Sequence, residues 1–278
     1  MVRVALSVVI ALVASALGYA AFWQGGSVLM REAVQFDRTT DPTALPFVVG
    51  GLVLLVVAML SVALSSVGVI TVAVIHLLFG LLAVLNPSLP FIRLIAQSFG
   101  EGSTIGDGML YSVSTGIGML AGIVFLVTGL AVLTRRSQKP GAVARVASVI
   151  VAIVAGPMGV LLAFMGGGLV YADLAVPATG GFNPTGAVLL LVGTVLLGLA
   201  VLTLRWSSVG LMVLGSAIAV IGSFGLVEPG QLASIVERVS RELSVTVQFA
   251  APNGNLALLG MLLLAAALGT LLRSRRWR

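Results

Sequence analysis

The chain has 278 residues, of which 59% are hydrophobic and 9% are charged, and its mean hydropathy is +1.18. Soluble domains carry roughly 25% charged residues, so this composition excludes a water-soluble fold and predicts an integral membrane protein. The net charge is +6, but the basic residues lie at the ends of apolar segments and therefore predict membrane topology, not binding to nucleic acid. The absence of cysteine excludes disulfides and thiolate metal sites.

Apolar runs of about 20 residues, the length that crosses about 30 Å of hydrocarbon, follow one another along the chain. We count eight, at approximately residues 4–23, 45–64, 67–85, 109–133, 146–170, 186–204, 209–227 and 256–272. The first run also fits a cleaved signal peptide, because Arg3 precedes it and it contains Ala14-Ser15-Ala16. An internal repeat argues that this run is retained as a span.

The predicted loops are strongly asymmetric in charge. One side carries ten basic residues and no acid, whereas the other carries five arginines and all nine acids. Because basic loops stay in the cytoplasm, we expect a multi-pass protein of the plasma (inner) membrane with both termini cytoplasmic. Fourteen arginines against one lysine suggest a GC-rich bacterial genome.

A shift of 142 residues superimposes the two halves of the chain. Identical segments then coincide, namely Arg3-Val4-Ala5 with Arg145-Val146-Ala147, Ser65-Ser66-Val67-Gly68 with Ser207-Ser208-Val209-Gly210, and Gly118-Met119-Leu120 with Gly260-Met261-Leu262. The predicted fold is an all-α integral membrane protein of eight transmembrane helices, built as two parallel four-helix repeats at residues 1–137 and 138–278. Because each repeat has an even number of spans, we expect the repeats to be related by an axis along the membrane normal. Each has the layout of tetraspan proteins, but no motif identifies a family.

His76 is the intramembrane polar candidate, because ionisable groups are costly inside a bilayer. It falls in the middle of the third span, and the residue 142 positions later is Ile218. A histidine hydrogen-bonded within the bundle is one interpretation, and a proton-relay or ligand-binding role is the other. With a single histidine and no cysteine, we predict no metal site, no cofactor and no catalytic residue.

Acids in the outer loops are the second set of candidates, since carboxylates that converge could bind a cation or catalyse hydrolysis. These outer carboxylates are Asp37, Asp41, Glu101, Asp107 and Asp173. Their spacing does not require them to meet, and solvation of the loops explains them as well. Gly118 and Gly122 in the fourth span are four residues apart, which favours close helix packing within the bundle or between copies.

The outer segment 231–249 predicts a single amphipathic helix. Its apolar residues recur at helical spacing and are Leu232, Ile235, Val236, Val239 and Leu243, while Glu237 with Arg241 and Arg238 with Glu242 are spaced as ion pairs. Segment 89–99 has a similar pattern in the first half. We expect these short helices to lie along the outer bilayer surface, to fold over the bundle, or to offer the apolar face to a partner.

These patterns favour a non-catalytic polytopic membrane protein that assembles with, or scaffolds, a membrane or envelope protein partner. Little intramembrane polarity is present to line a path, and the outer loops hold most of the unexplained charge. The alternative is a transporter of a small solute or lipid through the interface between the repeats. An envelope enzyme acting on lipid-linked substrates is a third possibility and would need the outer carboxylates to meet.

Overall fold

The computed structural model describes residues 1–34, 42–85, 90–100, 103–134, 141–175 and 183–276. Within these residues the regular structure is helical throughout, and no strand occurs. Eight helices are long and apolar enough to cross a membrane, as the sequence predicts. They are α1 (Val2–Val34), α2 (Ala44–Leu60), α3 (Ser66–Leu85), α6 (Ile117–Thr134), α7 (Ala142–Ala175), α8 (Pro184–Leu202), α9 (Val209–Val227) and α12 (Asn255–Arg276).

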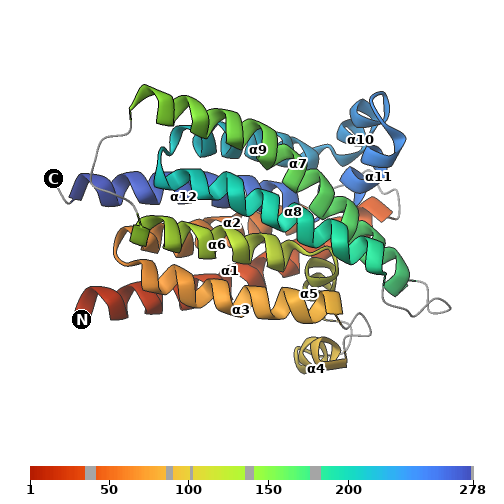
Figure 1. Cartoon of the computed structure of the whole chain (residues 1–278). Helices are drawn as coiled ribbons and strands as arrows, with labels where there is room; N and C mark the ends of the chain where they lie inside the picture. Colours follow the sequence, from red (N-terminus) through yellow and green to blue (C-terminus); the bar gives the residue numbers. More distant parts are fainter. Residues whose placement is uncertain (35–41, 86–89, 101–102, 135–140, 176–182, 277–278) are drawn as a thin grey trace.

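The eight long helices form one bundle, and both chain termini lie at the same end of it (Figure 1). Four short helices gather at the opposite end, which we call the cap end. They are α4 (Pro90–Ser98), α5 (Thr104–Ser114), α10 (Pro229–Glu237) and α11 (Arg241–Ala250). In Figure 1, α4 and α10 lie on opposite sides of the bundle at this end.

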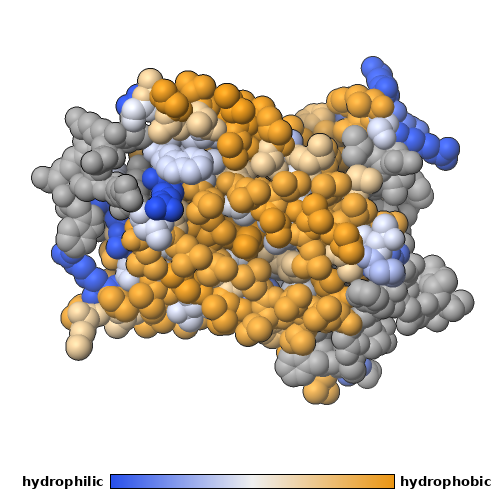
Figure 2. Space-filling model, viewed as in Figure 1, coloured by the Kyte–Doolittle hydropathy of each residue, from blue (hydrophilic) through white to orange (hydrophobic). Residues whose placement is uncertain are grey.

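The middle of the bundle surface is apolar. Figure 2 shows a broad hydrophobic belt across the long helices, with hydrophilic residues toward both ends. Large apolar side chains such as Val9, Val195 and Val220 are 57%, 60% and 69% exposed to the surroundings of the chain. A belt of this kind is the surface that hydrocarbon covers, so the protein is a multi-pass membrane protein.

Close backbone contact joins α1 to α2. A side chain on Gly51 would place its Cβ 2.6 Å from the carbonyl oxygen of Gly18 and 2.6 Å from the amide nitrogen of Phe22. Only glycine fits there, because lipid gives no hydrophobic drive and helices associate through such close packing. The Ser7 hydroxyl also donates to the carbonyl oxygens of Ser61 (3.2 Å) and Ser65 (2.9 Å), which fixes α1 against the turn between α2 and α3.

The turns that join α2 to α3 and α8 to α9 are short, and each begins with a 3₁₀ turn, η1 (Ser61–Ala63) or η2 (Thr203–Arg205). The helices that each turn joins are nevertheless not main packing partners. Packing in the first half runs α2–α1–α3–α6, and in the second half α8–α7–α9–α12. The halves meet where α6 packs on α8, α12 packs on α2, and α6 packs on α12.

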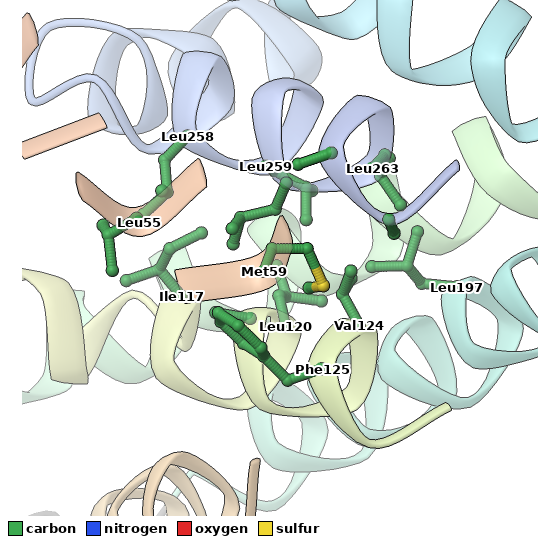
Figure 3. Packing of buried hydrophobic residues seen from close by; sticks show 14 of the residues in the cluster. Leu55, Met59, Ile117, Leu120, Val124, Phe125, Leu197, Leu258, Leu259 and Leu263 are labelled. Atoms are coloured by element: carbon green, nitrogen blue, oxygen red, sulfur yellow. The ribbon is translucent and has the colours of Figure 1, made fainter. Parts of the chain in front are cut away.

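The interface between the halves is filled by apolar side chains (Figure 3). Ten of them point toward one another from α2, α6, α8 and α12, and each is 0% exposed. They are Leu55, Met59, Ile117, Leu120, Val124, Phe125, Leu197, Leu258, Leu259 and Leu263. Interiors packed in this way have few voids larger than a water molecule.

The structure corrects the predicted fourth span, 109–133. Met109 belongs to α5, and a turn at Gly116 with φ +78 separates α5 from α6, which begins at Ile117. The apolar run continues through this turn, so hydropathy alone does not mark it. The first and fifth spans are also longer than predicted, since α1 has 33 residues and α7 has 34. At 1.5 Å per residue each is about 50 Å long, which exceeds the hydrocarbon thickness.

Candidate functional site

A column of polar and aromatic side chains lies inside the first half. Ser15, Tyr19 and Trp23 are spaced four residues apart on α1 and therefore share one face of that helix. His76 reaches this face from α3, and Phe125 reaches it from α6. Three helices thus position the one histidine of the chain.

His76 makes a hydrogen bond and two ring contacts. Its Nε2 atom lies 3.1 Å from the Ser15 hydroxyl oxygen, and its ring centroid lies 4.6 Å from that of Tyr19 and 6.1 Å from that of Phe125. Trp23 continues the column, with its ring 5.4 Å from Tyr19. The structure therefore gives His76 a bonded place within the bundle, in keeping with the first of the two interpretations of this residue.

Two donors in the column lack a partner. The Tyr19 hydroxyl and the Trp23 Nε1 are buried and form no hydrogen bond within the chain. Buried donors are normally satisfied by protein or by ordered water. The sequence pattern points to His76 but not to Tyr19, because a tyrosine within an apolar run gives no polar signal of its own.

The Ser15–His76 pair has the separation of a nucleophile and its general base. Catalysis by such a pair requires a group that orients the imidazole and access for a substrate. No acid among the described side chains contacts His76, and Ser15 is 5% exposed between helices. The pair can share a proton in a hydrogen bond, and no further chemistry follows from this geometry.

The second half has an apolar counterpart of this column. Ile218, which lies 142 residues after His76, is 7% exposed and belongs to the hydrophobic core with Val160 and Phe164. The polar column is therefore a property of the first half alone.

The outer carboxylates are only partly described. Asp37, Asp41 and Glu101 lie outside the described residues, and so does the side chain of Asp173, although its backbone belongs to α7. Asp107 on α5 accepts a hydrogen bond from Arg31 on α1 at 3.0 Å, and both side chains are more than 40% exposed. Within the part of the chain that the structure describes, no three His, Asp or Glu side chains are grouped as metal ligands.

The predicted single helix over 231–249 is wrong. The structure breaks this segment into α10 and α11, because the chain turns at residues 238–240. The turn folds α11 back, and the Ser244 hydroxyl donates to the carbonyl oxygen of Ala233 at 3.0 Å. Glu237 and Arg241 consequently fall on different helices and form no ion pair.

The predicted apolar face of this segment is divided in the structure. Leu232 is 7% exposed and packs toward Gly225 of α9, and Val236 is partly buried. Ile235 is 52% exposed and Val239 is 81% exposed, so the bundle does not cover them. The side chain of Leu243 lies outside the described residues.

A second buried polar group lies where α6 and α12 begin, and sequence reasoning missed it. The Asn255 side-chain amide donates to the Thr115 hydroxyl at 3.0 Å, which joins the two halves. The Asn253 Nδ2 and the Asn255 Oδ1 are buried without a partner. The signal was present in the turn residues Pro252-Asn253-Gly254, whose glycine has φ +79.

Comparison of the chain with protein-family models, with curated proteins and with solved structures finds no match.

Proposed function

We propose that this protein is a non-catalytic membrane protein that assembles with another membrane or envelope protein at its cap end. The observation that carries the proposal is the filled interface between the halves, where ten apolar side chains are fully buried. An interior of this kind suits a rigid framework. It leaves no polar surface along which a solute would move.

The exposed charges of the cap support this location for the partner. Glu237, Arg238 and Arg241 are all exposed around the turn between α10 and α11. Charges at the rim of an interface contribute to partner selection and association rate more than to affinity. The cap is held firmly enough to present them, since α10 packs on α9 and α11 packs on α7.

Cross-linking in native membranes tests the proposal. A photo-reactive residue at Arg238 should yield a discrete adduct with a second protein, and mild detergent should copurify that protein in stoichiometric amount. Val195 provides the matched control, because it is 60% exposed in the middle of α8 and should react with lipid only. Recovery of the chain alone, with no adduct from Arg238, would contradict assembly at the cap.

Transport through the interface between the halves is the alternative. It requires the packed leucines of α2, α6, α8 and α12 to separate during each cycle. Replacing Leu120 and Leu259 with tryptophan should block such a path while preserving apolar packing chemistry. Uptake that persists in proteoliposomes of the unaltered chain and ceases in this variant would favour the transporter.

We also infer that the chain is a tandem duplication, and equivalent contacts support this. Gly51 meets the Gly18 carbonyl oxygen in the first half, and Gly193 approaches that of Gly159 in the second. Gly68 and Gly210 likewise lie against the carbonyl oxygens of the serines Ser7 and Ser148. Shared glycine contacts of this kind are not expected from apolar composition alone.

Contacts between the halves are also paired. Gly26 of α1 lies against the Asn253 carbonyl oxygen before α12, and Gly167 of α7 lies against the Thr115 carbonyl oxygen before α6. This reciprocity fits two parallel units at residues 1–137 and 138–278 related by a two-fold axis along the membrane normal. We place both termini in the cytoplasm of a bacterial cell, on the charge bias of the loops.

A further inference from the structure

Both α4 and α10 begin close to the level at which a span leaves the hydrocarbon. The span α9 has 19 residues and α3 has 20, so each is about 30 Å long and matches the hydrocarbon thickness. Glu228 alone separates α9 from α10. The first turn of α10 therefore lies at the boundary between acyl chains and headgroups.

These helices also lie beside the bundle and not over its centre. In Figure 1, α10 lies next to the end of α9 and α4 lies next to the end of α3, on opposite sides of the cap end. Each is held by one protein neighbour: α10 by Leu232 against Gly225 of α9, and α4 by the backbone of Ala96 against Gly106 of α5. Helices in this position have lipid, not protein, beneath their free sides.

The free sides carry large apolar side chains. On α10 and the following turn they are Ile235 and Val239, at 52% and 81% exposure, and on α4 and just after it they are Leu94 and Phe99, at 65% and 48%. These patches continue the apolar surface of the spans. Val220 and Val227 of α9 are 69% and 55% exposed and lead toward α10, while Leu85, at 61%, ends α3 before α4.

We propose that α4 and α10 are interfacial helices that rest on the bilayer leaflet at the cap end, one on each side of the bundle, and insert Leu94, Phe99, Ile235 and Val239 among the acyl chains. Helices of this type bury their apolar face roughly 5–10 Å into the boundary between headgroups and acyl chains. The exposed Arg238 and Arg241 then lie at the level of the phosphates, where they favour anionic lipid. This inference concerns lipid contact and does not depend on the proposed protein partner.

Single-cysteine labelling tests the proposal directly, because the chain contains no cysteine. Leu94→Cys, Ile235→Cys and Val239→Cys are labelled with an environment-sensitive fluorophore in nanodiscs of phosphatidylethanolamine and phosphatidylglycerol. Ser234→Cys is the matched control on α10, since Ser234 is an exposed polar neighbour of Ile235. Each label is then exposed to a lipid with a nitroxide near the top of its acyl chain and, separately, to iodide in the water.

The expected result is that labels at 94, 235 and 239 emit at shorter wavelength, lose most of their fluorescence to the nitroxide lipid and resist iodide. The label at 234 should respond to iodide instead. Quenching of all labels by iodide alone would overturn the proposal, because the helices would then stand away from the membrane. Protection from both quenchers would overturn it as well and would show that protein covers the apolar patches.

Discussion

Gly122 of α6 and Gly260 of α12 make the same contact with the third span of their own half. A Cβ on Gly122 would lie 2.9 Å from the Leu77 amide nitrogen, and a Cβ on Gly260 would meet the Ala219 amide nitrogen. The sequence match pairs Gly260 with Gly118 instead, four residues earlier. The contacts and the sequence match therefore differ by about one helical turn.

This difference separates two glycines that the sequence treats as one motif. A Cβ on Gly118 would have its nearest neighbour at 3.8 Å, whereas on Gly122 it would lie 2.8 Å from the Leu77 Cγ. Gly118→Ala should leave the free energy of unfolding unchanged or slightly higher, and Gly122→Ala should lower it by about 1–3 kcal/mol through overpacking. Reversible unfolding in mixed micelles measures both. Equal losses would show that both glycines lie in tight contacts.

The slip of one turn shows why hydropathy predicts spans better than register. The second half has a shorter segment between its third and fourth spans, since residues 228–254 follow α9 and residues 86–116 follow α3. The four missing residues are close to one helical turn, so an ungapped match keeps the same helix face aligned and gives no warning. Number and position of the spans follow from apolar length alone, and they were predicted correctly apart from the boundary at Gly116.

The polar column illustrates a second limit. An isolated histidine in a span is conspicuous, but its partners Ser15 and Tyr19 are 61 and 57 positions away and are common residue types. Only the packing of α1 against α3 brings them together. The cap shows a third limit, because helical spacing over 231–249 predicts amphipathicity but does not locate the turn at Val239.

Replacing His76 with isoleucine tests whether the column is structural. The second half has Ile218 at the same offset, in an apolar environment that is fully compatible with the fold. His76→Ile removes one hydrogen bond and should change the free energy of unfolding by no more than about 1 kcal/mol, as should Ser15→Ala. Partner recovery at the cap should be unchanged. Loss of a cellular phenotype with intact stability would indicate a proton-relay or ligand-binding role.

Topology can be tested with reporter fusions at the two ends of the chain. Because one side carries ten basic residues and no acid, alkaline phosphatase fused after Arg278 should be inactive and a fluorescent protein at the same place should be bright. A phosphatase fusion in the loop 176–182 should be active. The opposite pattern of activities would invert the orientation of the whole bundle.

The packing between halves predicts that they can assemble from separate chains. Residues 1–137 and 138–278, produced together, should copurify because α6 packs on α8 and α12 packs on α2. Arg273 also donates to the Val62 carbonyl oxygen at 3.1 Å and ties the end of the second half to the first. Leu197→Asp should abolish copurification, since Leu197 is 0% exposed, whereas Val195→Asp faces away from the interface and should retain it. Halves that never associate, although each is membrane-inserted, would contradict a stable interface.

The two sides of α10 should respond differently to an introduced charge. Leu232 is 7% exposed and contacts α9, so Leu232→Asp loses about 2 kcal/mol of apolar burial and adds the cost of an unpaired carboxylate among apolar groups. Val239 is 81% exposed, so Val239→Asp should leave the unfolding temperature nearly unchanged while it weakens contact with the bilayer. Glu237→Gln with Arg241→Gln should cost less than about 1 kcal/mol, because exposed charges contribute little to stability. Thermal unfolding in nanodiscs, followed by the native tryptophans, ranks the three variants. If Val239→Asp unfolds the protein as readily as Leu232→Asp, the turn between α10 and α11 must be packed against the bundle, and the interfacial position of α10 would be wrong.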